Sequence, residues 1–398
     1  MPNPHLPPET LDYIVDLIHD EPETLKECCL VSKSWVPRTR KQLFADIKFH
    51  SPSDLESWKK TFPDIANSPA YYTRTLLVGY PRPITASGAE EGSWIQAFSR
   101  VRSLDVNNGN KFFGATDVSL VPFHKFSPTL KSLRVGFILI PYPGLLDLIC
   151  SFPLLEDLSL KGHDRWLDDD DPYGSQTITR STSPALTGSL DFHIFGGAGK
   201  IARRLLDLPN GLHFRKLALS WDQKTDPSWI AELVMKCSHT LESLDITYTF
   251  RRTCIHICPH TDSLTLFQVG TTGSVSGSFD LSKATKLRDL VFRPEWGATR
   301  WIAKTLETIT PERQELQQIS IHVPSWLSSY GADIKESLGE AALEQWLDLD
   351  RLLLQLWEVH LILPKVEYAR PEGRGEITEY CIGCLFPEIT KSGVVELD

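Results

Sequence analysis

A short pattern of apolar residues recurs along this chain and predicts a series of strands, each with one buried face. The pattern is Leu-x-x-Leu-x-(Val/Ile/Leu), whose last positions alternate between apolar and polar as they do along a half-buried strand. It is clearest in residues 126–135 and 237–246, where Ser, Thr, Leu, Ser and Leu occupy matching positions. Further copies lie at 101–106, 155–160, 214–219, 287–292, 316–321 and 356–361, and looser copies lie at 76–78, 190–192 and 264–266.

The spacing of these copies predicts a repeat architecture. From Leu104 to Leu244 successive copies are 25 to 32 residues apart, and the later steps are 46, 29 and 40 residues. Short segments with helical periodicity lie between the copies, at 94–99, 143–152, 200–208, 229–237 and 299–309. The pattern resembles the strand signature of leucine-rich repeats, which implies strand–helix units that stack into a curved solenoid with one continuous core.

The segment before the repeats, residues 5–49, predicts three short helices. The first helix has one apolar stripe at helical spacing, formed by Leu11, Ile14, Val15 and Ile18. Pro22 is expected to end this helix, because a proline disfavours the helical conformation of the residue before it. One face of the predicted second helix carries Leu25, Cys28, Cys29 and Ser32. Ser34 is expected to cap a third helix that reaches Leu43 and Phe44.

The order of residues in this segment resembles the F-box. The matching residues are Leu6, Pro7, Glu9, Leu11, Ile14, Leu25, Cys29, Leu30, Val31, Ser32, Trp35, Leu43 and Phe44. Ser34 departs from the family, in which many members carry a basic residue before the tryptophan. The resemblance implies a helical module that docks on the Skp adaptor of a cullin–RING ubiquitin ligase. The adaptor-facing residues it implies are Leu6, Pro7, Leu11, Ile14, Leu25, Val31, Trp35 and Leu43.

A second binding surface is expected on the strands. Residues that flank the buried positions of each copy point to the opposite face of the sheet, which is the concave face of a solenoid. This places a mixed-charge surface, expected to bind a target protein, on Arg134, Asp157, Lys161, Lys216, Trp221, Asp245, Asp289, Arg293 and His322.

Composition narrows the class of protein further. Apolar residues make up 41% of the chain, charged residues 23%, and the formal net charge is −10, so a nucleic-acid groove is not expected. The eight cysteines have no regular spacing, which favours a reducing compartment over a disulfide framework. No signal segment and no apolar run long enough to span a bilayer is recognisable. These features predict a soluble protein of the cytoplasm or nucleus, without membrane or nucleic-acid partners.

Several other motifs resemble nucleotide-binding or metal-binding sites, but a purely structural role explains each of them better. Gly197-Ala-Gly199-Lys-Ile-Ala202 fits a dinucleotide-binding fingerprint, with Asp222 at suitable spacing. The preceding residues 190–194 alternate between apolar and polar, however, whereas the first strand of such a fold is apolar throughout. Three further sets are expected to bind no metal: Cys254, His256, Cys258 and His260, whose extended span is too long; the pair Cys381 and Cys384; and the run Asp168 to Asp171.

The sequence thus predicts an α/β chain with an F-box at 5–49, a linker helix region at 50–69, a curved leucine-rich-repeat-like solenoid at 70–363 and a C-terminal cap or tail at 364–398. The expected function is substrate recognition in a Skp–cullin–F-box ligase, with no catalysis and no cofactor. One alternative is a repeat scaffold that does not support ubiquitin transfer. A less favoured alternative is a nucleotide-binding enzyme that uses the turn at Gly197 and Gly199.

Overall fold

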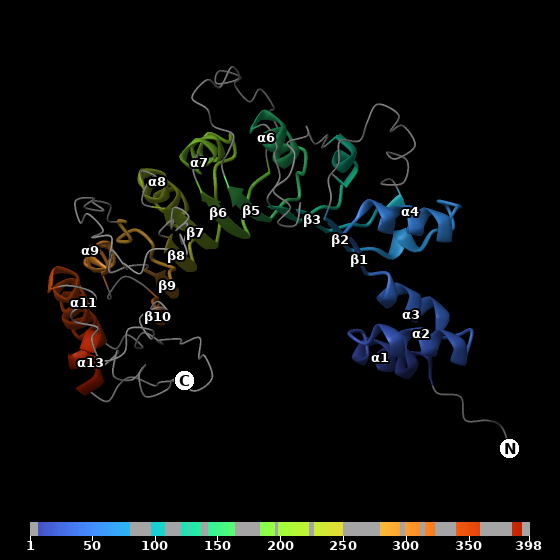
Figure 1. The fold of residues 1–398 in the computed structure, drawn as a ribbon, viewed down its shortest axis with the longest axis horizontal. Coiled ribbons are helices and arrows are strands. Elements are labelled where there is room, and N and C mark those ends of the chain that lie inside the picture. Colours follow the sequence, from blue (N-terminus) through green and yellow to red (C-terminus); the bar gives the residue numbers. More distant parts are fainter. Residues whose placement is uncertain are drawn as a thin grey trace, which may run out of the picture. The chain divides into compact units, whose positions relative to one another are not determined.

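The computed structural model describes residues 7–79, 97–107, 121–126, 128–136, 142–163, 184–195, 198–222, 227–249, 279–294, 299–310, 315–322, 340–358 and 384–391. The predictions at Leu6, at 264–266 and at Asp168 to Asp171 lie outside these residues. The chain forms two compact units, the first made of residues 1–162 and 172–185 and the second of residues 163–171 and 186–398. The protein is α/β, and the residues that the structure describes form ten parallel strands in the order β1-β2-β3-β4-β5-β6-β7-β8-β9-β10 (Figure 1).

The first unit begins with three helices, α1 (Pro8–Leu17), α2 (Pro22–Val31) and α3 (Val36–Leu43). Pro8 and Pro22 are the first residues of their helices, where the missing amide would have had no partner within the helix. Pro22 therefore begins α2, and the expectation that it ends the first helix was wrong because α1 stops at Leu17. The cap expected at Ser34 was also wrong, since Trp35 precedes the first helical residue and no side chain caps it.

The rest of the first unit alternates strands with helices. Its elements are β1 (Asp46–Phe49), α4 (Pro52–Thr61), the 3-10 helix η1 (Pro69–Tyr72), β2 (Thr75–Val78), β3 (Ser103–Asn107), the 3-10 helix η2 (Val121–Phe126), β4 (Ser132–Gly136), α6 (Tyr142–Cys150) and β5 (Asp157–His163). The predicted strands at 76–78, 101–106, 130–135 and 155–160 are confirmed by β2, β3, β4 and β5. Strand β1 was not predicted: residues 46–49, assigned to the F-box, pair with β2 in the sheet.

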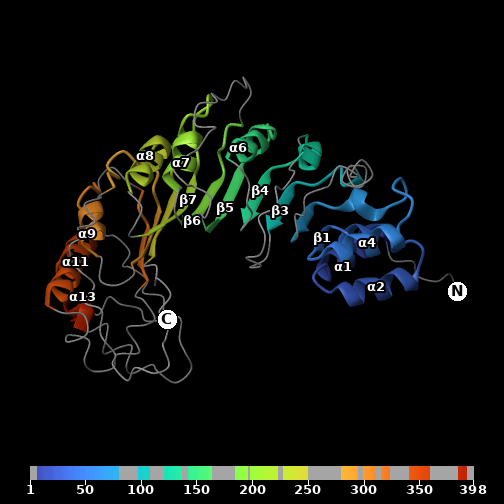
Figure 2. The ribbon, with the colours of Figure 1, turned by 45° about the horizontal axis from the view of Figure 1, so that its top comes forward.

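The second unit continues with β6 (Ser189–Phe195), α7 (Ala198–Leu206), β7 (Lys216–Asp222), α8 (Ser228–Cys237), β8 (Ser243–Thr249), β9 (Asp289–Arg293), α9 (Arg300–Leu306), β10 (Gln318–Ile321), α11 (Glu340–Glu358) and α13 (Pro387–Lys391). Helices α7, α8 and α9 lie along one side of the strands (Figure 2). The strand expected at 356–361 was wrong in its first half, because residues 356–358 form the last turn of α11.

The register of the sheet aligns equivalent positions of the predicted repeats. Leu104 of β3 faces Leu133 of β4, which faces Leu158 of β5. In the second unit the same column runs through Leu190, Leu217, Leu244, Leu290 and Ile319. All of these side chains are at most 2% exposed, so the fourth position of each copy builds the core. Burying a leucine of this kind contributes about 1.5–3 kcal/mol relative to leaving it exposed.

Hydrogen bonds from threonine hydroxyls link several pairs of neighbouring repeats at positions outside the strands. The Thr129 hydroxyl donates to the Val101 carbonyl at 2.6 Å, and the Thr240 hydroxyl donates to the Phe214 carbonyl at 3.0 Å. Thr73 makes the same kind of bond to the Phe44 carbonyl at 3.0 Å. These side chains satisfy carbonyls that the strand ladder leaves unpaired just before each strand.

Candidate functional site

The N-terminal helices pack around a small interior. Val15 of α1 and Leu25 of α2 are each 1% exposed, and Cys28 lies beside them at 9%. Thr39 of α3 is fully buried, and its hydroxyl donates to the Trp35 carbonyl at 2.8 Å. The predicted apolar face of the second helix is therefore confirmed for Leu25 and Cys28.

Helices α1 and α3 are also joined by a polar contact. The Asp16 carboxylate accepts hydrogen bonds from Arg38, one of them from Nε at 2.9 Å, and from the Gln42 amide at 2.5 Å. The hydrogen bonds from Arg38 are the main reason that the pKa of Asp16 lies below its usual value, and the same contact raises the pKa of Arg38. The carboxylate thus stays charged and holds α3 against α1.

The predicted adaptor-facing residues divide between surface and interior. Pro7 and Val31 are exposed, and Leu25 is buried in the helical interior. Partly exposed positions are occupied by Leu11, Ile14, Trp35 and Leu43. Leu6 lies outside the described residues. Leu25 therefore supports the module from within, whereas Pro7, Leu11, Ile14, Val31, Trp35 and Leu43 are at least partly exposed.

Besides the predicted Val31, the helices expose Tyr13, Leu17 and Leu30, which the sequence analysis did not assign to the adaptor surface. Leu30 is 87% exposed and Val31 70%, at the C-terminal end of α2. On α1, Tyr13 and Leu17 are 65% and 64% exposed. Exposed apolar side chains are common one by one, but Leu30 and Val31 are adjacent in the chain and together leave apolar surface in solvent that a partner could cover. The sequence held a signal for this exposure, because Leu30 is apolar but lies outside the buried stripe that Leu25 and Cys28 form on the same helix.

The expected target-binding residues lie on or next to strands. Arg134 reaches Asp105 of the neighbouring strand at 3.6 Å. Burial is the main cause that raises the pKa of Asp105, and the charges of Arg134 and Lys161 partly oppose it. Lys216 and Asp289 are exposed at the starts of β7 and β9, and Asp157 is half-buried at the start of β5.

Three of these residues from different strands come together in the second unit. The Arg293 side chain pairs with Asp245 of β8 at 3.2 Å. The Nη1 group of Arg293 donates to Nδ1 of His322, just after β10, at 3.1 Å. Parallel register brings them together, because Arg293 stands opposite Thr247, two residues beyond Asp245.

Trp221 does not belong to this surface. It is 1% exposed, and its ring packs against Trp301 with centroids 4.9 Å apart and against Tyr248 at 5.2 Å. Its expected surface position was wrong because Trp221 is separated by even steps from the buried Leu217 and Leu219. The alternation of a strand therefore turns it to the core side.

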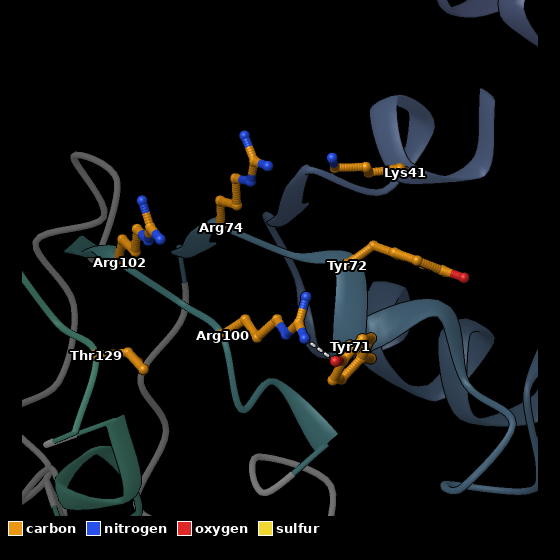
Figure 3. A pocket seen from close by; sticks show the side chains of 7 residues that line it. All are labelled: Lys41, Tyr71, Tyr72, Arg74, Arg100, Arg102 and Thr129. Atoms are coloured by element: carbon orange, nitrogen blue, oxygen red, sulfur yellow. Dashed lines mark hydrogen bonds between the residues drawn. The ribbon is translucent and has the colours of Figure 1, made fainter. Parts of the chain in front are cut away.

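A cavity in the first unit, here called the basic pocket, was not predicted. It is lined by Lys41, Tyr71, Tyr72, Arg74, Arg100, Arg102 and Thr129 (Figure 3). The sequence held a signal for it, since Arg74, Arg102 and Lys131 occupy the same position of successive repeats, directly before the strand residues.

The motifs considered for metals and nucleotides fall largely outside the described residues. This is the case for Gly197, for Cys254 to His260 and for Cys381, whereas Gly199 lies on α7 and Cys384 is a free thiol. Among the residues that the structure describes, no group of three or more His, Cys, Asp and Glu side chains is arranged to hold a metal ion. No described helix combines the length and the apolar character needed to cross a bilayer.

No protein-family model matches this chain, and no curated protein matches it. The resemblance to the F-box and to leucine-rich repeats therefore depends on the residues and spacings given above.

Proposed function

We propose that this chain is the substrate-recognition subunit of a Skp–cullin–F-box ubiquitin ligase. The observation that carries the proposal is the N-terminal helical module, in which Val15 and Leu25 fill the interior while Leu30 and Val31 stand exposed. A small module that leaves large apolar side chains in solvent gains by burying them against a partner. The ordered F-box residues of the same helices indicate that this partner is a Skp-type adaptor.

The remainder of the chain, in this proposal, is a leucine-rich-repeat-like solenoid that holds a target protein. The strands follow one another in the sheet in the order in which they occur in the chain, and equivalent leucines form a column across them. Both observations support a repeat architecture in which each strand–helix repeat packs on its neighbours. Within each unit the strand order does not reverse. Open α/β sheets usually bind ligands where the order reverses, so this order gives little support to the alternative of a nucleotide-binding enzyme.

The chain would act without catalysing a reaction. By binding the adaptor with one part and a target with another, it would raise the effective concentration of the target near the charged conjugating enzyme. The proposed target-binding residues lie on the polar strand surface of each unit, with Arg134 in the first unit and Asp245 and Arg293 in the second.

The adaptor contact can be tested by co-purification of the full chain with a Skp adaptor and a cullin. We expect the wild-type chain to retain both proteins, and the double variant Leu30→Asp/Val31→Asp to lose them because charges would be buried in the contact. A matched control is Met235→Asp, which places a charge on an exposed apolar position of α8, 57% exposed, far along the chain. The control should bind as the wild type does.

Two results would overturn the proposal: failure of the wild-type chain to bind the adaptor, or equal binding by the Leu30→Asp/Val31→Asp variant. Adaptor binding without a cullin would instead support the scaffold alternative. Circular dichroism of the variants should match the wild type, since both substituted side chains are exposed.

A further inference from the structure

The basic pocket gathers four cationic side chains in a cavity of about 430 Å³ within the first unit. Lys41 comes from α3, Arg74 and Arg102 precede β2 and β3, and Arg100 comes from the turn before Arg102. Figure 3 shows the Arg74 and Arg102 side chains extending in the same direction, with the Lys41 amine turned toward Arg74. A volume of this size lies in the range of sites for small molecules, roughly 300–1,000 Å³.

The backbone fixes the two central arginines side by side. The Arg102 amide donates to the Arg74 carbonyl at 2.7 Å, and the Lys131 amide donates to the Arg102 carbonyl at 2.8 Å. Adjacent strands lie about 4.8 Å apart, so the backbones of equivalent residues in neighbouring repeats are held at that spacing. Both arginine side chains are exposed, and solvent weakens the repulsion between their like charges without removing it.

The charge of Asp16 on α1 acts on Lys41, but no described carboxylate lines the pocket itself. The described residues that line the pocket include no Asp or Glu, and no ion pair to Lys41, Arg74 or Arg102 is found among the described residues. Elsewhere in the fold cations do pair: Lys131 reaches Glu156 at 2.6 Å and Arg288 reaches Glu315 at 2.8 Å. The pocket is thus a cluster of cations that a bound anion would stabilise.

The fourth cation is held in place by an aromatic ring. The Arg100 guanidinium lies 3.8 Å from the centre of the Tyr71 ring and donates a hydrogen bond to the Tyr71 hydroxyl. Tyr72 and Thr129 also line the pocket, and the Thr129 hydroxyl is already bonded to the Val101 carbonyl. The site therefore combines positive charge, guanidinium donors and aromatic surface. This combination suits an anion that has a molecular framework as well as charged groups.

We propose that the basic pocket binds a small molecule carrying two or more phosphate groups. Guanidinium groups donate paired hydrogen bonds that match phosphate oxygens, and a multiply charged anion is needed to offset several cations. The volume suits a small molecule, and the site is separate from the exposed α1 and α2 surface proposed for the adaptor. The proposal thus does not depend on the proposed ligase function.

The test uses the full chain and sodium tripolyphosphate, with sodium chloride added to equal ionic strength in all samples. Isothermal titration should show one site, and the thermal unfolding midpoint should rise with tripolyphosphate, because a ligand that binds the folded state stabilises it. Orthophosphate should bind more weakly. Arg74→Gln and Arg102→Gln should each weaken tripolyphosphate binding by roughly tenfold or more, as expected for the loss of charge-assisted hydrogen bonds.

The matched control is Arg215→Gln, which removes an exposed arginine from the equivalent repeat position in the second unit and should leave binding unchanged. Without ligand, the two pocket variants should unfold at the same temperature as wild type or higher, because the repulsion is relieved. The proposal is overturned if wild type does not bind tripolyphosphate, or if both pocket variants bind as wild type does. It is also overturned if a doubly phosphorylated peptide binds more tightly than tripolyphosphate, since the ligand would then be a protein segment.

Adaptor co-purification of Arg102→Gln separates the two proposals. We expect it to remain at the wild-type level while tripolyphosphate binding falls. Loss of both together would overturn the separation of this site from the adaptor surface.

Discussion

The Arg38 guanidinium on α3 donates hydrogen bonds to the Asp16 carboxylate on α1, with Nε 2.9 Å from Oδ1. The two side chains are 22 positions apart in the chain, so this contact ties the first helix to the third rather than stiffening one helix. Asp16 is 40% and Arg38 27% exposed, which places the pair at the edge of the module.

Asp16→Asn should destabilise the helical module by roughly 0.5–1 kcal/mol, a value reduced for solvent screening of a partly exposed pair. The pKa of Asp16 is lower in the folded state. Its contribution is therefore present above the usual carboxyl pKa of about 3.9 and is lost as the pH falls through the lower folded value. Urea unfolding of wild type and variant between pH 2 and 7 should show the difference shrinking at acid pH. The control Glu23→Gln removes the exposed partner of Lys26 on α2 and should change little.

Trp221→Ala should destabilise the second unit by about 3–5 kcal/mol, because it empties a cavity among aromatic rings in the core. Lys216→Ala, in the same strand but exposed, should cost less than about 0.5 kcal/mol. Thermal unfolding of both variants checks this. Equal effects would show that Trp221 faces solvent, as the sequence analysis expected.

Thr240→Val should cost about 1 kcal/mol, because the Phe214 carbonyl loses the hydroxyl that donates to it at 3.0 Å while the side chain keeps its shape. Thr129→Val should act in the same way through the Val101 carbonyl. Thr285→Val is the control, as Thr285 is exposed. Equilibrium unfolding in urea measures all three, and a control as destabilised as Thr240→Val would contradict the role given to these hydroxyls.

Cys237 should resist alkylation in the folded protein. Burial raises the pKa of its thiol to about 11, so at pH 8 almost none of it is the reactive thiolate. Iodoacetamide labelling followed by mass spectrometry should modify the partly exposed Cys29 and Cys384 first. Labelling of Cys237 should accelerate in urea, in step with unfolding. Rapid labelling of Cys237 without denaturant would contradict its burial in α8.

Much of the fold could be predicted because its signals are local. The alternation around Leu104, Leu133 and Leu244 predicted strands that the structure confirms, and the helical segments at 143–152, 200–208, 229–237 and 299–309 correspond to α6, α7, α8 and α9. Strand β1 escaped prediction because its residues were assigned to the end of the F-box, although Phe44-Ala-Asp-Ile47-Lys-Phe49 has the same apolar spacing as the copy at 214–219. Leu356 matched the strand pattern but lies on α11, where a helical apolar face uses the same residue types.

The sequence by itself determined most of the strands and helices, because apolar periodicity along a short segment usually distinguishes them; β1 and the end of α11 are the exceptions. Only the tertiary structure decided which charged residues meet. Arg74 and Arg102 converge through parallel register, Arg293 reaches Asp245 across a strand pair, and Arg38 reaches Asp16 between two helices. The physical reason is that side-chain charges interact through space over a few ångströms, whereas the pattern along the chain records only which face of its own element each residue occupies.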